Sequence, residues 1–167
     1  MKILISHIIR QLNEVKEGKP WMGESFRKKI EALAENDALT RPLQNLHSVA
    51  EIISHLTVWR KDASLKIRTG RGKLTIESKE NWLHNDILKG IGWEKIMNDY
   101  NESLAELIDL IKDREDDFLN EIYFDNDYKG NYSYLYLLEG ILQHDIYHLG
   151  QIGIVIKLLD EMKANLK

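Results

Sequence analysis

The chain has 167 residues and no cysteine. Disulfides, thiolate metal ligands and a cysteine nucleophile are therefore excluded. Its two prolines, Pro20 and Pro42, both lie early, so the rest of the chain is free to form long helices. No apolar run approaches the roughly 20 residues that span a bilayer, and nothing near the N-terminus resembles a signal peptide. These absences lead us to expect a cytoplasmic protein that does not enter a membrane.

The chain also lacks a surplus of positive charge, because it contains 23 Lys and Arg residues and 27 Asp and Glu residues, for a formal net charge of -4. This balance gives no support to a nucleic-acid partner. The composition, with 43% hydrophobic and 30% charged residues, is that of an ordinary soluble protein. The length suits one domain with a sizeable core, which we place at residues 1–167.

Two motifs that could bind an ion or a phosphate group are incomplete. The acidic segment Asp125–Gly130 resembles a calcium-binding loop, but Lys129 occupies a ligand position. The segment Gly70–Lys73 lacks the glycine spacing and the following hydroxyl residue of a phosphate loop. We therefore expect neither calcium nor phosphate at these segments.

Apolar residues recur at helical spacing over four long segments of the chain. These segments cover about residues 2–17, 49–67, 92–113 and 133–163. Ser48 is expected to cap the second helix, and Glu51 three residues later completes a capping box. The connections are expected to hold a short helix over about 24–35, a loop over 36–47, a crossover over 69–86 with an extended piece at 73–76, and a polar turn over 125–131.

Four amphipathic helices bury their apolar stripes most simply against one another. We therefore predict an all-α protein, a four-helix bundle. The long link between the second and third helices implies a crossover connection. An up-down-down-up arrangement is accordingly favoured over simple up-down-up-down order.

Histidines at helical spacing are the main chemical feature of the sequence. His144 and His148 lie on one face of the predicted last helix, where two imidazoles can bind one transition metal. His55 on the predicted second helix is the candidate third ligand. Three imidazoles would leave one or two positions open for water or substrate, as in a catalytic site. The spacing alone is also compatible with partly exposed histidines bound to water or carboxylates. Because Asp145 follows His144, the HExxH pattern of zinc proteases is absent.

Two segments resemble the signature motifs of DinB-like proteins. Residues 48–59 are similar to the second-helix motif of that family, and residues 144–152 to its HxxYHxGQI motif. Trp82 and Trp93 also fall where many members carry tryptophans. The resemblance covers about residues 1–163.

The resemblance implies a bundle of the DinB/YfiT-like type and a divalent metal, nickel or zinc, held by His55, His144 and His148. Some relatives are transferases or isomerases that use bacillithiol, mycothiol or glutathione. The implied function is therefore a metal-dependent enzyme that acts on a small molecule, with a low-molecular-weight thiol as co-substrate. A metal-dependent hydrolase and a non-catalytic metal- or ligand-binding dimerisation module stay open as alternatives. No residue is assigned as catalytic, and a homodimer is expected because it is the commonest closed assembly.

Four further predictions concern the surroundings of the histidines. Glu51 lies one turn before His55 and could accept a hydrogen bond from that ring, although the capping box is the favoured explanation. Gln151 could bind a metal-bound water or serve as a buried structural amide. Tyr147 points away from the histidine face and is expected to pack on a neighbouring helix or a second subunit. The aromatic residues between 123 and 136 are expected to anchor loops, with a pocket mouth as the alternative.

Overall fold

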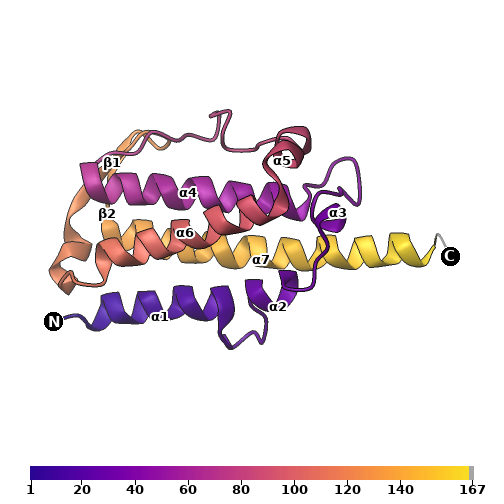
Figure 1. The fold of residues 1–167 in the computed structure, drawn as a ribbon. Coiled ribbons are helices and arrows are strands. Elements are labelled where there is room, and N and C mark those ends of the chain that lie inside the picture. The colour runs from indigo at the N-terminus through magenta and orange to yellow at the C-terminus, as the bar shows by residue number, and fades with distance from the viewer. Residues whose placement is uncertain (166–167) are drawn as a thin grey trace.

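The computed structural model describes residues 1–165 and is mostly helical (Figure 1). Within these residues four long helices form a bundle: α1 (Ile3–Glu17), α4 (Val49–Thr69), α6 (Trp93–Ile111) and α7 (Tyr134–Ala164). The predicted four-helix bundle is confirmed, and each predicted helix end lies within two residues of the observed one. Residues 166–167 of the predicted domain lie outside the described residues. None of the described helices combines the length and apolar character needed to cross a membrane.

The two ends of α4 follow from the local sequence. The Ser48 hydroxyl accepts a hydrogen bond from the Glu51 amide at 3.2 Å, and the Glu51 carboxylate accepts one from the Ser48 amide at 2.8 Å. The predicted capping box is thereby confirmed. At the other end Gly70 adopts a left-handed φ of 74°, which costs glycine little because it has no Cβ.

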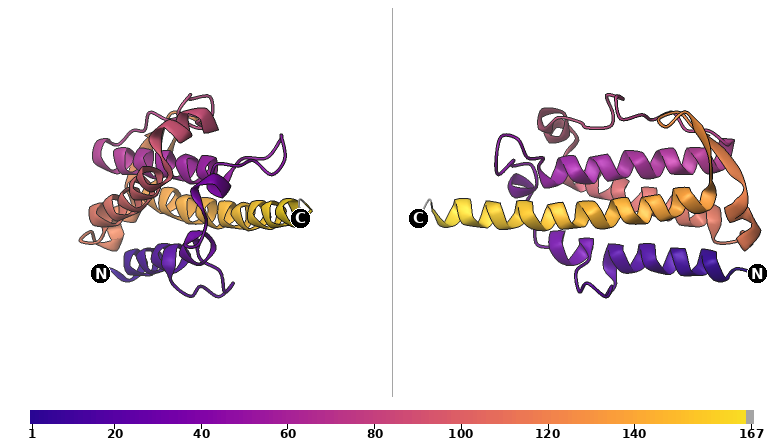
Figure 2. Two further views of the ribbon diagram at one scale, coloured as in Figure 1. Left: turned by 45° about the vertical axis from the view of Figure 1, so that its right-hand side comes forward. Right: turned by 180° about the vertical axis from the view of Figure 1, so that it is seen from behind.

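Helix α4 packs against two of the other long helices. It contacts α6 and α7, and α1 contacts α7. In Figure 1, α1 and α7 run from left to right, whereas α4 and α6 run from right to left. After α4 the chain therefore returns along the bundle through residues 70–84 before α5 (Asn85–Ile91) begins. Figure 2 shows this segment from behind, again along the outer side of α4.

The hydrophobic core consists of two clusters arranged along the bundle. The first contains apolar residues from the first two turns of α4 and from the second half of α7. The second contains residues from the last turns of α4 and the first turns of α7. Arg60 and Asp145 are buried between these two sets. The middle of the contact between α4 and α7 is therefore polar.

The connections hold more regular structure than the sequence indicated. The predicted helix over 24–35 is the shorter α2 (Phe26–Ile30), and the predicted loop over 36–47 overlaps α3 (Glu35–Ala38). A 3-10 helix, η1 (Asp116–Asn120), follows α6. These elements have four or five residues each, too few for a periodic apolar pattern to reveal them.

A β-hairpin flanks the predicted polar turn. Strands β1 (Ile122–Asp125) and β2 (Gly130–Ser133) pair antiparallel. The amide of Phe124 donates to the carbonyl of Gly70 at 2.8 Å, which ties the hairpin to the start of the crossover. The extended piece predicted at 73–76 is not a strand, and the isolated bridge to β1 lies at Arg71 instead.

Candidate metal centre

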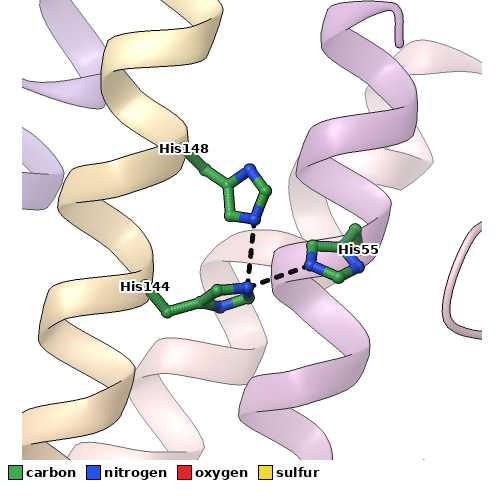
Figure 3. A group of neighbouring side chains, drawn as sticks. All are labelled: His55, His144 and His148. Atoms are coloured by element: carbon green, nitrogen blue, oxygen red, sulfur yellow. Dashed lines mark hydrogen bonds between the residues drawn. The ribbon is translucent and has the colours of Figure 1, made fainter. Parts of the chain in front are cut away.

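His55 from α4 meets His144 and His148 from α7 inside the bundle (Figure 3). Nε2 of His144 lies 2.9 Å from Nε2 of His55 and 3.0 Å from Nε2 of His148. Each ring offers one ligand atom, and these atoms all lie within 4.8 Å of one another. The fold therefore brings together the three residues that the sequence predicted as metal ligands.

The second nitrogen of two of these rings is fixed by a carbonyl oxygen. His55 Nδ1 donates to the backbone carbonyl of Asn81 at 2.9 Å, and His148 Nδ1 donates to Oε1 of Gln151 at 2.6 Å. Because a carbonyl oxygen only accepts, both rings carry a proton on Nδ1 and present a bare lone pair at Nε2.

This proton arrangement makes the cluster suited to a cation. Nε2 of His55 and Nε2 of His148 are both hydrogen-bond acceptors, and each lies close to Nε2 of His144. Neutral His144 can carry at most one proton on Nε2, so it can donate a hydrogen bond to only one of them. In the other contact two nitrogen lone pairs then face each other without a hydrogen between them, which is unfavourable. A bound metal ion would satisfy all three nitrogens at once, and the Nδ1 hydrogen bonds of His55 and His148 are typical of metal-bound imidazoles.

Burial keeps the three imidazoles neutral. Burial, followed by the neighbouring His148 and His55, lowers the pKa of His144 to about 3. Burial together with His55 lowers the pKa of His148 to about 4, and burial also lowers the pKa of His55. Near neutral pH the rings are therefore uncharged, which is the form of imidazole that binds metals.

The crossover segment supplies one wall of the site. The ring of Trp82 stacks on His55 with 3.9 Å between centroids and on His47 with 3.8 Å. Asn81 fixes this segment, because its Oδ1 accepts a hydrogen bond from Nε1 of Trp59 at 2.8 Å. No signal in the sequence pointed to Asn81, since it binds His55 through its backbone carbonyl.

A cavity of about 560 Å³ opens beside His55 and His144. It lies between α4, the crossover, the hairpin and the first turns of α7, and three tyrosines contribute to its lining: Tyr123, Tyr128 and Tyr136. The expectation that these aromatic residues only anchor loops is therefore incomplete. The open side of the histidine cluster faces space large enough for a small organic molecule.

Comparison with known proteins assigns the chain to a family. A family model described as the DinB superfamily matches residues 21–152. The chain belongs to the DinB superfamily. Among solved structures, YfiT from Bacillus subtilis matches with a TM-score of 0.60 and 12% identity, over 95% of this chain and 87% of that chain. YfiT is described as "a probable metal-dependent hydrolase with an unusual four-helix bundle topology". At this identity the similarity concerns the fold. No curated protein matches the chain.

The two predicted supporting residues of this DinB-superfamily chain have different roles. Gln151 contacts the His148 ring itself, so it orients a predicted ligand. Glu51 does not bind His55, because its carboxylate accepts hydrogen bonds from the Arg41 guanidinium, at 2.8 Å for Nε, and from the Ser48 amide. The favoured interpretation of Glu51 as a capping-box residue is therefore confirmed, and the alternative that it orients His55 is not.

Tyr147 does not pack on a neighbouring helix. Its side chain is 63% exposed, and its ring lies near that of His148 on the same helix, with 5.0 Å between centroids. Contact with a second subunit stays a prediction, as does the homodimer.

Sequence reasoning missed a buried ion pair next to the histidines. Nη2 of Arg60 lies 2.7 Å from Oδ2 of Asp145 and donates to the hydroxyl of Tyr100 at 3.2 Å. Burial alone would lower the pKa of Arg60, but the carboxylate of Asp145 outweighs it and raises that pKa. Arg60 follows Leu56 by one turn and Asp145 follows Ile141 by one turn, so both occupy positions of apolar stripes. A charge on the buried stripe of each of two helices was the signal in the sequence.

Proposed function

We propose that this chain is a divalent-metal-dependent enzyme that acts on a small organic molecule. The observation that carries the proposal is the convergence of three imidazole Nε2 atoms beside a cavity of about 560 Å³. Three protein ligands with one open side are typical of catalytic zinc sites, whereas structural sites are closed by a fourth ligand. The description of YfiT as a probable metal-dependent hydrolase supports the same assignment by analogy of fold.

The three imidazole ligands also limit which metal ions are expected to bind. Imidazole nitrogen suits zinc, nickel and related first-row metals, whereas magnesium and calcium prefer oxygen ligands. When bound, such an ion lowers the pKa of a coordinated water or thiol and thereby supplies the nucleophile. Asn81 and Gln151 hold the Nδ1–H groups of His55 and His148, so that both Nε2 atoms stay directed to one point. Trp82 covers one face of His55.

The nucleophile that we favour is the sulfur of a low-molecular-weight thiol. Within residues 1–165 the potential ligand group contains histidines only, so no carboxylate belongs to it that could accept a proton. A thiol that loses its proton to solvent on coordination needs no protein base. Its sulfur then forms a bond to an electrophilic carbon of the second substrate, and the leaving group departs with the electron pair of the broken bond.

Hydrolysis is the second candidate, and the YfiT neighbour is the observation that favours it. In this version the oxygen of water bonds to a carbonyl carbon and its proton passes to solvent, and the alkoxy group of the ester departs with the electron pair of the broken C–O bond. The histidines keep the same role, and the cavity holds a single substrate rather than a substrate and a thiol.

The test compares two reactions in one preparation of protein. The full chain is stripped with chelator, reloaded with Zn²⁺ or Ni²⁺, and assayed for conjugation of small thiols to an aryl halide and for hydrolysis of an aryl ester. We expect metal-dependent conjugation. Metal-dependent ester hydrolysis without conjugation would favour the second candidate. Metal binding with neither reaction would favour the non-catalytic module, and failure to bind either metal would overturn the whole assignment.

A further inference from the structure

The cavity extends from the histidines toward the hairpin end of the bundle. On α7 its lining runs from His144 back to Tyr136, and on α4 from His55 forward to Lys66. At a rise of 1.5 Å per residue the eight-residue interval on α7 corresponds to about 12 Å. In Figure 1 the hairpin lies at this end, beside the end of α4 and the start of α7. A ligand that reaches the histidines therefore has its other end between the hairpin and α7.

Negative charge predominates in this lining. Its four charged residues are Lys66, Asp125, Asp127 and Glu139. The Lys66 ammonium is already compensated, because it lies 2.8 Å from Oδ2 of Asp125 and 3.1 Å from Oδ2 of Asp62. Among the ion pairs formed within residues 1–165, none involves the carboxylate of Asp127 or that of Glu139. The far end of the cavity therefore attracts a positive group and repels an anion.

Aromatic rings accompany these two carboxylates. Tyr128 and Tyr136 line the same end, and each is more than half exposed. Tyr132 neighbours both rings, with its ring centroid 4.9 Å from that of Tyr136 and 5.8 Å from that of Tyr128. Deeper in the cavity the Lys66 ammonium already lies 5.4 Å from the ring centroid of Tyr123. Electron-rich ring faces together with carboxylates are the surroundings that recognise organic cations.

An inorganic cation fits this end poorly. Among residues 1–165 the one group of three or more acidic or histidine ligands close enough to hold a metal ion is the histidine cluster. Asp127 also uses Oδ1 to accept a hydrogen bond from the Ile76 amide at 2.9 Å. The carboxylates therefore act as separate charges beside ring faces and not as a chelating set.

We propose that the cavity binds a small organic cation, an amine or a quaternary ammonium compound. Its positive group lies near Asp127 and Glu139 against the rings of Tyr128 and Tyr136, and its other end reaches toward His144. This inference deepens the proposed function and rests on it for the role of that second end. The binding of the cation itself requires neither metal nor turnover, so the two proposals can fail separately.

The test uses three probes of nearly equal shape that differ in charge. Choline is the cation, 3,3-dimethyl-1-butanol its neutral counterpart and 3,3-dimethylbutyrate the anion. Binding to the metal-free full chain is followed by NMR chemical-shift titration. We expect choline to bind at least about threefold more tightly than the neutral alcohol, in line with cation–π and carboxylate contacts at a partly exposed site, and the anion to bind most weakly.

Matched variants locate the contact. Glu139→Gln combined with Asp127→Asn should reduce choline affinity about threefold to tenfold and leave the alcohol unchanged. The Asp127→Asn change keeps a side-chain oxygen for the Ile76 amide, so the loop contact is retained. Glu161→Gln is the control, because it removes one charge from an exposed position near the other end of α7. Equal binding of choline and the alcohol, stronger binding of the anion, or no saturable choline binding would each overturn the inference.

Discussion

Two polar clusters lie next to each other between α4 and α7: the three histidines, and the ion pair of Arg60 with Asp145. They differ in what compensates their polar atoms. His55 and Arg60 are five residues apart on α4, and His144 and Asp145 are neighbours on α7. Arg60 and Asp145 find their opposite charge within the chain at 2.7 Å. The histidines instead direct three Nε2 atoms at one another beside a cavity. The same pair of helices thus carries one contact whose opposite charges both come from the chain and one cluster of neutral donors that would suit a metal ion.

The ion pair is not ideal for stability. Nε and Nη1 of Arg60 and Oδ1 of Asp145 are buried without a hydrogen-bond partner within the described residues. Such pairs often contribute less than well-packed apolar residues of similar volume, yet losing one member is costly. Because Arg60 lies on α4 and Asp145 on α7, the pair links the two helices that carry His55 and His144.

Removal of one member of the ion pair should have the largest effect. Asp145→Ala leaves the Arg60 guanidinium buried without its counter-charge, so the free energy of unfolding should fall by about 3–5 kcal/mol. Urea denaturation of the metal-free protein measures this. The double variant Arg60→Met, Asp145→Leu is the control and should unfold within about 1 kcal/mol of the native chain or at higher urea. A loss below about 1 kcal/mol for Asp145→Ala would show that the pair is not a constraint.

Removal of a histidine should affect metal binding and spare the fold. His148→Ala should weaken Zn²⁺ binding by more than about 100-fold, beyond the range typical for residues that only support a ligand. Far-UV circular dichroism should show unchanged helical content. His7→Ala, at an exposed position on α1, should leave Zn²⁺ affinity unchanged. Unfolding of the His148→Ala protein during purification would mean that His148 is structural.

The histidines should also make the metal-free protein sensitive to acid. In the unfolded chain a histidine has a pKa of about 6.5, whereas in the fold the pKa of His144 is about 3 and that of His148 about 4. Between these values the unfolded state binds more protons, so stability is lost as the pH falls below about 6.5. We expect His144 and His148 each to contribute a decrease of about 2 kcal/mol between pH 7 and pH 5. His144→Gln should flatten this slope, and an unchanged slope in that variant would contradict the assignment.

The hydrogen bond that supports His148 should have the smallest effect. Gln151→Ala removes the acceptor of the His148 Nδ1–H and should reduce Zn²⁺ affinity about tenfold. Gln143→Ala removes an exposed glutamine of the same helix that makes no such bond and should change the affinity little. Equal effects of the two substitutions would argue against a specific role for Gln151.

Helical periodicity sufficed to predict the four long helices and the shared face of His144 and His148, because both depend on residues close in the sequence. The convergence of His55 on that face depends on packing between helices, and the family resemblance implied it. The hairpin at 122–133 was missed because two four-residue strands carry too little alternation to outweigh a turn signal. Asn81 acts through a carbonyl that every residue possesses. The pairing of Arg60 with Asp145 was detectable only as charges on apolar stripes, and their contact required the fold.

The most direct test of the three-histidine centre is a calorimetric Zn²⁺ titration of the chelator-treated chain and of its His55→Ala variant. His55 is the proposed ligand on α4, so its loss distinguishes a centre formed by both helices from a simple pair of histidines on α7. We expect one equivalent of Zn²⁺ per native chain and a loss of affinity of more than about 100-fold in the variant. Zn²⁺ binding of equal affinity in both proteins, or none in the native chain, would contradict a metal centre formed by His55, His144 and His148.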